Sequence, residues 1–289
     1  MSGPHAPRRD LTIRVLRQVD LTAADRLRKQ AGFNQTRQDW ERLLAFEPTG
    51  CFQAHAGGRL LGTVTTTVFD QGLAWIGMVL VDHSARGSGI GSLLVDHAIR
   101  YLETERGVAC IGLDATPAGA SIYHRRNFSA MYGLSRWEGV AAPSAPHHNV
   151  RSMTRQDLPA MARLDRSAFG ADRKDILSAL FYSPSARCVV IEHGGETVGF
   201  AMARPGAQRW HIGPVIATGT AIADTLVNAT LSQLAGKPVE IDIPDPLGPS
   251  LTARYKLRPV RPFTRMLRGI PPQPIAQGLV QLPVGPELG

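Results

Sequence analysis

A basic, glycine-rich turn between two apolar segments contains the residues best suited to chemistry. The turn is Arg86-Gly87-Ser88-Gly89-Ile90-Gly91, and it follows a short apolar run at residues 76–81 that predicts a buried strand. Apolar residues then recur every three or four positions up to Tyr101, which predicts an amphipathic helix. Glycines let the backbone approach a ligand, and the first amides of a helix lack partners within it. With the charge of Arg86, the segment predicts a phosphate or diphosphate site.

The glycine spacing excludes two other phosphate-binding motifs. A P-loop needs Lys followed by Ser or Thr after its last glycine, but Gly91 is followed by Ser92. A dinucleotide fingerprint needs Gly-x-Gly-x-x-Gly, but Gly87, Gly89 and Gly91 are spaced two and two. The remaining pattern, Arg-x-x-Gly-x-Gly, resembles the coenzyme A pyrophosphate turn of the GNAT superfamily of acyl-CoA-dependent N-acyltransferases. The alternative is a glycine-rich turn without a ligand.

The resemblance also assigns a role to the strand before the turn. In GNAT proteins this strand separates from its neighbour, and its free backbone groups pair with the pantetheine arm and polarise the thioester carbonyl. The net charge of +8 is compatible with an anionic ligand such as acetyl-CoA. The resemblance implies contacts to coenzyme A from Met78, Val79, Leu80, Val81, Arg86, Gly87, Ser88, Gly89, Ile90, Gly91 and Thr116.

A tyrosine further along the chain is the candidate general acid. The segment Ile122-Tyr123-His124-Arg125-Arg126-Asn127-Phe128 is similar to the Leu-Tyr-x-x-x-Gly-Phe element of GNAT enzymes, with Asn127 in place of glycine. The resemblance implies that Tyr123 lies near the coenzyme sulfur and protonates the departing thiolate. A phenol with a pKa of about 10 keeps its proton at neutral pH. The alternative is a tyrosine that only packs at a helix end.

The general base is not evident from the sequence. GNAT enzymes often use a Glu on the core strand or a water relay, and here the core strand has no acidic residue before Asp82. Asp114, at the end of the next predicted strand, and His83 are weak candidates. The alternative role of Asp114 is structural, such as capping the helix that follows. Three widely separated cysteines predict reduced thiols, and no metal is implied.

The acceptor amine is expected beside the first two predicted helices and the core strand. Polar side chains next to aromatic ones suit a small amine or an amino acid. The candidate residues are Phe33, Asn34, Thr36, Asp39 and Trp40. The alternative is that Trp40 belongs to the core and that Asn34 or Thr36 caps the second helix.

Residues 150–268 repeat the plan of the first half. Gly62 and Gly77 are 15 residues apart, and Gly199 and Gly213 are 14 apart. Matched spacing of this kind indicates an internal duplication.

The second copy lacks the residues that carry the chemistry. It has no Arg-x-x-Gly-x-Gly turn, and Thr252 stands where Tyr123 stands in the first half. We therefore expect a degenerate copy that keeps the fold.

These patterns predict an α/β fold of two tandem GNAT-like domains, each with a central, mostly antiparallel mixed sheet flanked by helices. The expected divisions are a catalytic, acetyl-CoA-binding domain at residues 1–140, a linker at 141–149, a degenerate domain at 150–270 and a tail rich in Pro and Gly at 271–289, extended or partly disordered.

The composition limits the cellular compartment and the kinds of binding partner that we expect. No apolar run approaches the length of a membrane span, and the polar first ten residues contain no signal sequence, so we expect a cytoplasmic protein without a membrane partner. The charges are spread along the chain, which disfavours a nucleic-acid partner. The oligomeric state cannot be inferred.

The predicted function is acetyl-CoA-dependent N-acetyl transfer to the primary amine of a small molecule or amino acid, by direct attack. Two alternatives stay open. One is a non-catalytic acyl-CoA-binding sensor or scaffold, because the base is missing and Asn127 departs from the motif. The other is a protein or peptide N-acetyltransferase, which would need an open groove.

Overall fold

The computed structural model describes residues 11–70, 72–144, 147–248, 255–271 and 279–289. The chain forms two compact units, Met1–Ile111 and Gly112–Gly289. The division falls earlier in the chain than the linker expected at 141–149. The reason is that strand β6 (Ser129–Val140) pairs along both edges with strands of the C-terminal unit, β11 (Pro238–Pro244) and β12 (Arg258–Gly269).

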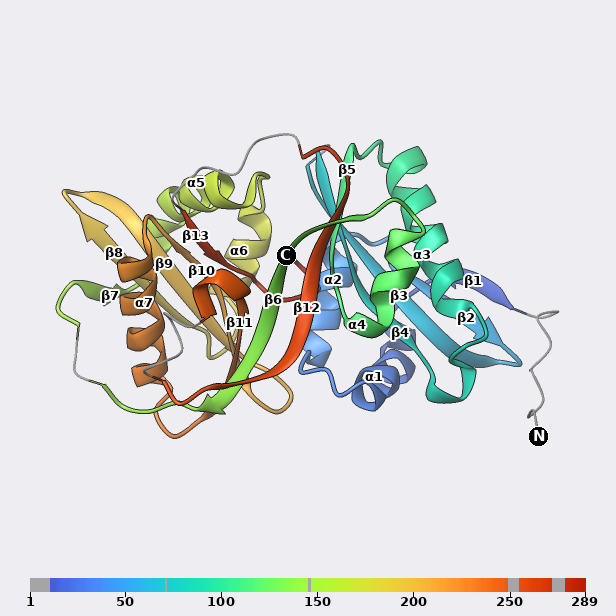
Figure 1. The fold of residues 1–289 in the computed structure, drawn as a ribbon, viewed down its shortest axis with the longest axis horizontal. Helices are drawn as coiled ribbons and strands as arrows, with labels where there is room; N and C mark the ends of the chain where they lie inside the picture. The colour runs from blue at the N-terminus through green and yellow to red at the C-terminus, as the bar shows by residue number, and fades with distance from the viewer. Residues whose placement is uncertain (1–10, 71, 145–146, 249–254, 272–278) are drawn as a thin grey trace. The chain divides into compact units, whose positions relative to one another are not determined.

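The described part of the N-terminal unit is built on an antiparallel sheet with the strand order β1-β2-β3-β4 (Figure 1). The strand bounds are β1 Thr12–Val15, β2 Phe52–Ala56, β3 Arg59–Asp70 and β4 Leu73–Val81. The turn between β2 and β3 uses Gly57 and Gly58, which have positive φ angles of 55° and 72°. Glycine adopts these angles without steric cost, so the hairpin forms where the sequence predicts it.

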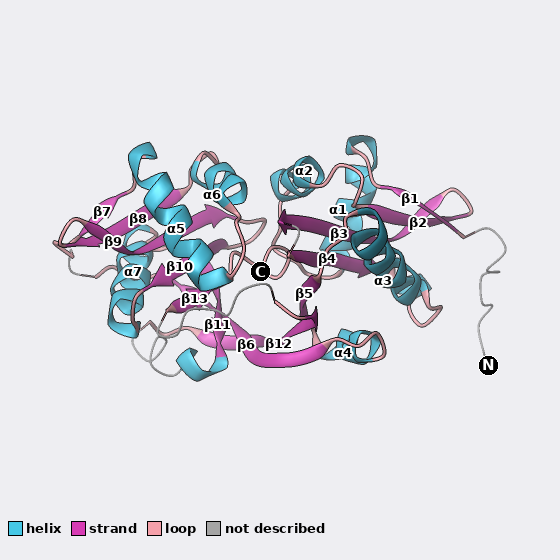
Figure 2. Ribbon diagram, turned by 90° about the horizontal axis from the view of Figure 1, so that it is seen from above, coloured by secondary structure: helices cyan, strands magenta, loops and turns pink. Residues whose placement is uncertain are grey.

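Three helices cover the two faces of this sheet. Their bounds are α1 Leu21–Gln30, α2 Arg37–Phe46 and α3 Ile90–Arg100, and α3 continues into a π-helical turn at Tyr101–Glu105. α3 packs closely on β3, because a Cβ atom on Gly62 would lie 2.8 Å from a methyl carbon of Leu94 and 3.1 Å from one of Ile90. α1 and α2 lie on the opposite face (Figure 2). The sheet therefore has helices on both faces, and the middle of its threonine-rich strand β3, residues 62–67, is buried.

The C-terminal unit has a longer mixed sheet, with β5 (Cys110–Ala115) crossing the boundary between the units. Its strand order is β5-β12-β6-β11-β10-β9-β8-β7, and β13 pairs with β10. The remaining strands are β7 Val150–Ser152, β8 Arg187–His193, β9 Glu196–Pro205, β10 Trp210–Ala217 and β13 Val280–Leu282. β10 and β11 are parallel, whereas β10 pairs antiparallel with β9 and β13. The expected α/β class with a mostly antiparallel mixed sheet is confirmed.

Helices cover both faces of this second sheet as well. Their bounds are α4 Pro117–His124, α5 Leu158–Phe169, α6 Lys174–Phe181 and α7 Thr220–Gln233. α7 packs on one face of β8, β9 and β10 in a core of small and branched apolar residues, and α5 and α6 lie on the other face (Figure 2). The order hairpin, core strand, long helix and further strand repeats that of the first half, as the duplication predicts.

The end of the chain is more ordered than its composition suggests. In residues 279–289, β13 pairs with Val215–Ala217 of β10, and Val284, Leu288 and Gly289 are buried. Arg204 donates to the Val284 carbonyl (2.9 Å) and to Glu287 (3.0 Å). The sequence predicts a tail that is extended or partly disordered; residues 280–282 are an extended strand, and strand pairing and a buried ion pair hold residues 279–289.

Candidate functional site

A distortion in β4 marks the strand that was expected to face coenzyme A. Met78 has a φ angle of +47°, although it is not glycine. The register to β3 shifts there: Thr65 pairs with Gly77 and Thr63 with Leu80, so β4 contains an extra residue. Such a bulge redirects backbone groups out of the regular ladder. A left-handed methionine costs free energy, and strain of this kind concentrates at functional sites.

The glycine-rich turn forms an open N-terminus for α3. Gly89 is the N-cap residue, with a φ angle of +87°, and no side chain caps the helix there. Gly87 also has a positive φ angle, +77°, and a Cβ atom at this position would meet nothing within 4 Å. The first turn of the helix therefore lacks a side-chain cap from Gly89 at the positive end of the helix dipole, and the loop before it borders open space at Gly87. This geometry fits a phosphate group.

The charged groups around the turn are unevenly exposed. Arg86 is exposed, and its Nε donates to the Val81 carbonyl at the end of β4 (3.4 Å). Asp82 is buried and accepts hydrogen bonds from the Ser84 amide (3.0 Å) and hydroxyl (2.7 Å), and these bonds lower the pKa of its carboxyl. The Arg26 guanidinium lies 3.5 Å from the Asp82 carboxylate. Asp82 is thus engaged by its own neighbours, and Arg86 keeps its guanidinium at the surface.

Tyr123, the candidate general acid, lies in the C-terminal unit near the end of α4. It is buried, and burial raises the pKa of its phenol to about 12. Its ring packs edge-on against Phe128, with 5.9 Å between the ring centroids. Asn127 has a φ angle of +60°, the left-handed conformation that glycine would adopt in the motif. Asparagine tolerates this conformation, so the substitution keeps the turn that follows the helix.

Two further predicted residues flank the start of α4. Thr116 is the N-cap residue of the helix, but its side chain makes no capping hydrogen bond. The Asp114 carboxylate accepts two hydrogen bonds from Arg265, at 2.9 Å and 2.8 Å. Burial raises the pKa of Asp114, and the guanidinium opposes that effect. Asp114 is therefore held in a closed ion pair, which supports a structural role over that of general base.

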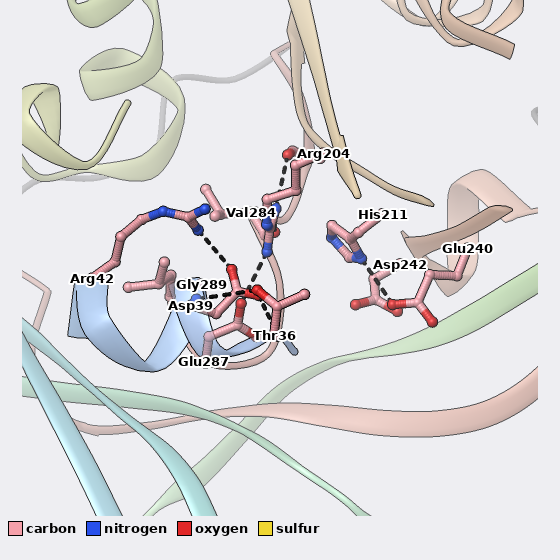
Figure 3. Close-up of polar contacts among 12 residues, drawn as sticks. Thr36, Asp39, Arg42, Arg204, His211, Glu240, Asp242, Val284, Glu287 and Gly289 are labelled. Carbon is pink, nitrogen blue, oxygen red and sulfur yellow. Dashed lines mark hydrogen bonds and ion pairs between the residues drawn. The ribbon is translucent and has the colours of Figure 1, made fainter. Parts of the chain in front are cut away.

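The predicted acceptor residues lie in the N-terminal unit, where they start α2. The Thr36 amide donates to the Asp39 carboxylate (2.6 Å), and the Asp39 amide donates to the Thr36 hydroxyl (3.3 Å), which is a capping box. Arg42 donates to the same carboxylate (2.6 Å; Figure 3). The capping interpretation of Thr36 is confirmed, and Asp39 is largely committed to it.

The other acceptor candidates are partly or fully buried. Trp40 has no exposed surface, and its indole Nε1 finds no hydrogen-bond partner among the described residues. Asn34 is 6% exposed. The Phe33 carbonyl accepts from Arg28 (2.7 Å), which fixes the loop before α2. Trp40 thus lies in the core, and a buried indole donor without an acceptor is costly and calls for an explanation.

The threonines of β3 are a feature that sequence reasoning missed. Thr63 donates from its hydroxyl to the Met78 carbonyl (2.9 Å), directly at the bulge. Thr65 and Thr67 follow on the same face of the strand, because side chains alternate along it. Both are buried, and their hydroxyls lack partners in the described residues. The four threonines at positions 63 and 65–67 are visible in the sequence, but only the pairing of β3 with β4 shows that Thr63 lies at the bulge.

The described residues give little support for a nucleophilic cysteine or a metal site. The three cysteines are free, and burial raises the pKa of Cys51 to about 12, of Cys110 to about 11 and of Cys188 to about 12. At neutral pH these thiols stay protonated and are poor nucleophiles. No group of three or more His, Cys, Asp or Glu side chains in the described residues is arranged to hold a metal ion. In the same residues, no helix combines the length and apolar character needed to cross a membrane.

Thr252, predicted to replace the tyrosine in the second half, lies outside the described residues. The remaining predicted residues are divided between the units. The N-terminal unit contains the strand, the turn and the acceptor candidates, and the C-terminal unit contains Asp114, Thr116 and Tyr123.

Comparison with known protein families finds two separate matches. Residues 19–128 match the model of the acetyltransferase (GNAT) family, and residues 161–280 match that of an acetyltransferase (GNAT) domain. Each match covers one of the two sequence repeats.

Individual proteins are similar to this chain over most of its length. The holothin acyltransferase of a Pseudoalteromonas strain is 25% identical over 71% of this chain and 69% of its own length. A putative acetyltransferase from Pyrococcus horikoshii is similar in structure with a TM-score of 0.82, covering 100% of this chain and 99% of that one at 22% identity. A tandem GNAT protein from the clavulanic acid biosynthesis pathway has a TM-score of 0.63 and 15% identity over 92% of this chain and 100% of its own.

Proposed function

The chain belongs to the GNAT superfamily as a tandem N-acyltransferase, and we propose that it transfers an acetyl group from acetyl-CoA to the primary amine of a small molecule or amino acid. In this proposal residues 1–140 are the catalytic domain, and residues 150–270 are a degenerate copy. The single observation that carries the proposal is the continuous path from the Met78 bulge through β4 to the uncapped start of α3.

The residues of this path fit an acyl-CoA ligand. Beyond the bulge, the backbone groups of Val79 to Val81 are the ones we assign to the pantetheine arm and the thioester carbonyl. The amides of Gly87 to Gly91 are assigned to the pyrophosphate, and the exposed Arg86 adds a positive charge beside them. Acetyl-CoA itself supplies the acyl group, activated as a thioester. An amide donor fixed toward the carbonyl oxygen stabilises the charge that develops there.

Tyr123 is the proposed general acid. When the acceptor nitrogen bonds to the carbonyl carbon, the carbon–sulfur bond breaks and its electron pair stays on sulfur. The Tyr123 hydroxyl then gives its proton to that sulfur, and the acylated nitrogen loses its extra proton, which restores the phenolate to a phenol. Its raised pKa, about 12, means that the phenol holds this proton at every physiological pH. The left-handed Asn127 preserves the turn after α4, which weakens the argument for a sensor based on that substitution.

The acceptor side is proposed from unsatisfied polar groups. The indole Nε1 of Trp40 and the hydroxyls of Thr65 and Thr67 are buried in the N-terminal unit, and a bound molecule with oxygen or nitrogen acceptors would satisfy them. None of the three is charged, which suits a small, mostly neutral molecule with one amino group. The Pseudoalteromonas relative is named a holothin acyltransferase, so holothin is the first acceptor to test.

The proposal is tested by isothermal titration of the full chain with acetyl-CoA, followed by a free-thiol release assay with holothin and a panel of primary amines and amino acids. We expect saturable binding of acetyl-CoA and thiol release that depends on an amine. Binding without release across the panel would favour the sensor. Release only with peptide amines would favour the protein acetyltransferase.

A further inference from the structure

The core strand of each half contains a bulge at nearly the same place. In the first half, β4 has an extra residue between Gly77 and Leu80, opposite β3. In the second half, β10 has an extra residue between Ile212 and Val215, opposite β9. A bulge redirects the backbone groups that follow it. The duplication therefore preserves the feature that the first half is proposed to use for its coenzyme.

The helix after each core strand is also placed alike. A Cβ atom on Gly199 of β9 would lie 2.8 Å from a methyl carbon of Leu226 and 2.9 Å from one of Ile222, both on α7. Gly62 of β3 approaches α3 in the same way. Gly62 pairs with the last residue of β4, and Gly199 pairs with the last residue of β10. The end of β10 therefore corresponds to the end of β4.

The two halves differ in the connection from this strand to its helix. Residues 82–89 separate β4 from α3, whereas residues 218–219 separate β10 from α7. The second connection is too short to contain a counterpart of the glycine-rich turn assigned to the pyrophosphate. The second half therefore keeps the strand geometry assigned to the pantetheine arm and lacks the turn assigned to the charged end of coenzyme A.

Beyond its bulge, β10 pairs with a segment of its own chain. Before the bulge, β10 pairs with β11 up to Ile212. Residues 215–217 pair with β9 along one edge and with β13, residues 280–282, along the other (Figure 1). In the first half, β3 likewise holds one edge of the last residues of β4. β13 thus lies along the strand edge that corresponds to the one assigned to the pantetheine arm.

Further contacts fix the segment 279–289 at the bulge. A Cβ atom on Gly213 would overlap with the Pro283 carbonyl oxygen, so the segment lies directly against the bulge. Arg204 donates to the carbonyls of Gly213 (3.4 Å) and Val284 (2.9 Å) and pairs with Glu287 at 3.0 Å (Figure 3). A buried guanidinium therefore joins the bulge to the segment that covers the strand edge.

We propose that the edge of residues 215–217, the second slot, is a vestigial pantetheine site whose ligand is the chain's own segment 279–289. This rests on the assignment of the pantetheine arm to β4 in the proposed function. The arm contains two amide groups, so it can pair along a strand edge as an extended peptide does. While β13 occupies the second slot, each chain binds one acetyl-CoA. When β13 leaves, the slot accepts an acyl-pantetheine arm.

Methyl NMR of the full chain, labelled at isoleucine, tests the occupied slot. Ile216 is buried in the middle of the paired stretch, Ile90 begins α3, and Ile→Val spectra assign both signals. We expect saturating acetyl-CoA to shift the Ile90 signal and leave that of Ile216 in place, with one binding site per chain by isothermal titration. A saturable shift of Ile216, or two acetyl-CoA sites, would overturn the proposal.

Two matched substitutions separate release of β13 from general loss of stability. Leu282→Ala truncates a buried side chain of β13, and Leu231→Ala removes the same atoms from α7 in the same core. Both should lower Tm, but Leu282→Ala alone loosens the segment. A ligand binds more tightly as its competent state becomes more populated, so the Kd of S-acetylpantetheine, followed at Ile216, should be at least about tenfold lower in Leu282→Ala than in Leu231→Ala.

Glu287→Gln is a second variant, because it weakens the contact with Arg204 and leaves the packed apolar atoms in place. Far-UV circular dichroism shows which variants are folded. A folded Leu282→Ala or Glu287→Gln chain in which S-acetylpantetheine never shifts Ile216, or shifts it no more tightly than in Leu231→Ala, would overturn the correspondence between β13 and the arm. Failure of the proposed function would appear elsewhere, as an Ile90 signal that acetyl-CoA never moves and as absence of thiol release.

Discussion

The Thr63 hydroxyl donates a hydrogen bond of 2.9 Å to the Met78 carbonyl, so β3 supports the bulge in β4 from the neighbouring strand. Met78 holds a strained φ angle of +47° at that point. Strain persists only where the surroundings hold it, and Thr63 is one such support. The bulge separates the regular part of β4 from the residues assigned to the thioester.

We predict that Thr63→Val lowers the free energy of unfolding by about 1–2 kcal/mol, because a buried carbonyl loses its donor. It should also weaken acetyl-CoA binding, because the bulge loses support. Thr65→Val is the control: the same change on the same strand face removes a hydroxyl that has no partner in the described residues. Urea denaturation and isothermal titration measure both effects. Equal behaviour of the two variants would contradict the role of Thr63.

Gly87 and Gly107 form a second matched pair. Both have positive φ angles, +77° and +64°, and open space where a Cβ would be. Alanine at either position should cost about 1–2 kcal/mol of stability through backbone strain. Only Gly87→Ala should raise the Kd for acetyl-CoA, by about tenfold, because it alone changes the pyrophosphate turn. Loss of affinity in Gly107→Ala as well would show that general destabilisation explains the effect.

Tyr123→Phe should lower kcat by a factor of about 100 or more and leave the Kd for acetyl-CoA nearly unchanged. Burial raises the phenol pKa to about 12, so Tyr123 carries its proton from pH 6 to pH 10. The ratio of wild-type to variant rates should therefore stay constant over that range. A pH–rate profile of both proteins measures it, and an unchanged kcat would remove Tyr123 from the mechanism.

Asp114→Asn should destabilise the protein by about 3–5 kcal/mol, because it leaves the buried Arg265 guanidinium without its carboxylate. Replacing both partners, Asp114→Leu with Arg265→Met, should recover much of that loss. Chemical denaturation of the single and double variants tests this. A double variant as unstable as the single one would show that packing, and not the unpaired charge, sets the cost.

Local patterns predicted much of the fold and less of the site. The glycine spacing located the turn before α3, and the repeated segments revealed the duplication, because both depend on short stretches of sequence. The bulge at Met78 was not predictable, since it depends on the register between β3 and β4. Asp114 looked like a possible base at a strand end, and its partner Arg265 comes from a strand far along the chain. The contact between His211 and Glu240 was likewise not predictable, because it exists only across paired strands.

The order of the chain end shows the same limit. Pro and Gly content indicates an irregular tail, but the pairing of β13 with β10 and the bond from Arg204 to Glu287 are long-range contacts. Composition does not contain that information.

The most direct test of the central claim is the rate of free thiol release from acetyl-CoA with and without an acceptor amine, with the acetylated amine identified by mass spectrometry. The account predicts saturable, amine-dependent thiol release, with one acetyl group added to the amine for each thiol released. Saturable acetyl-CoA binding with no amine-dependent thiol release, for holothin or any member of the amine and amino-acid panel, would contradict it.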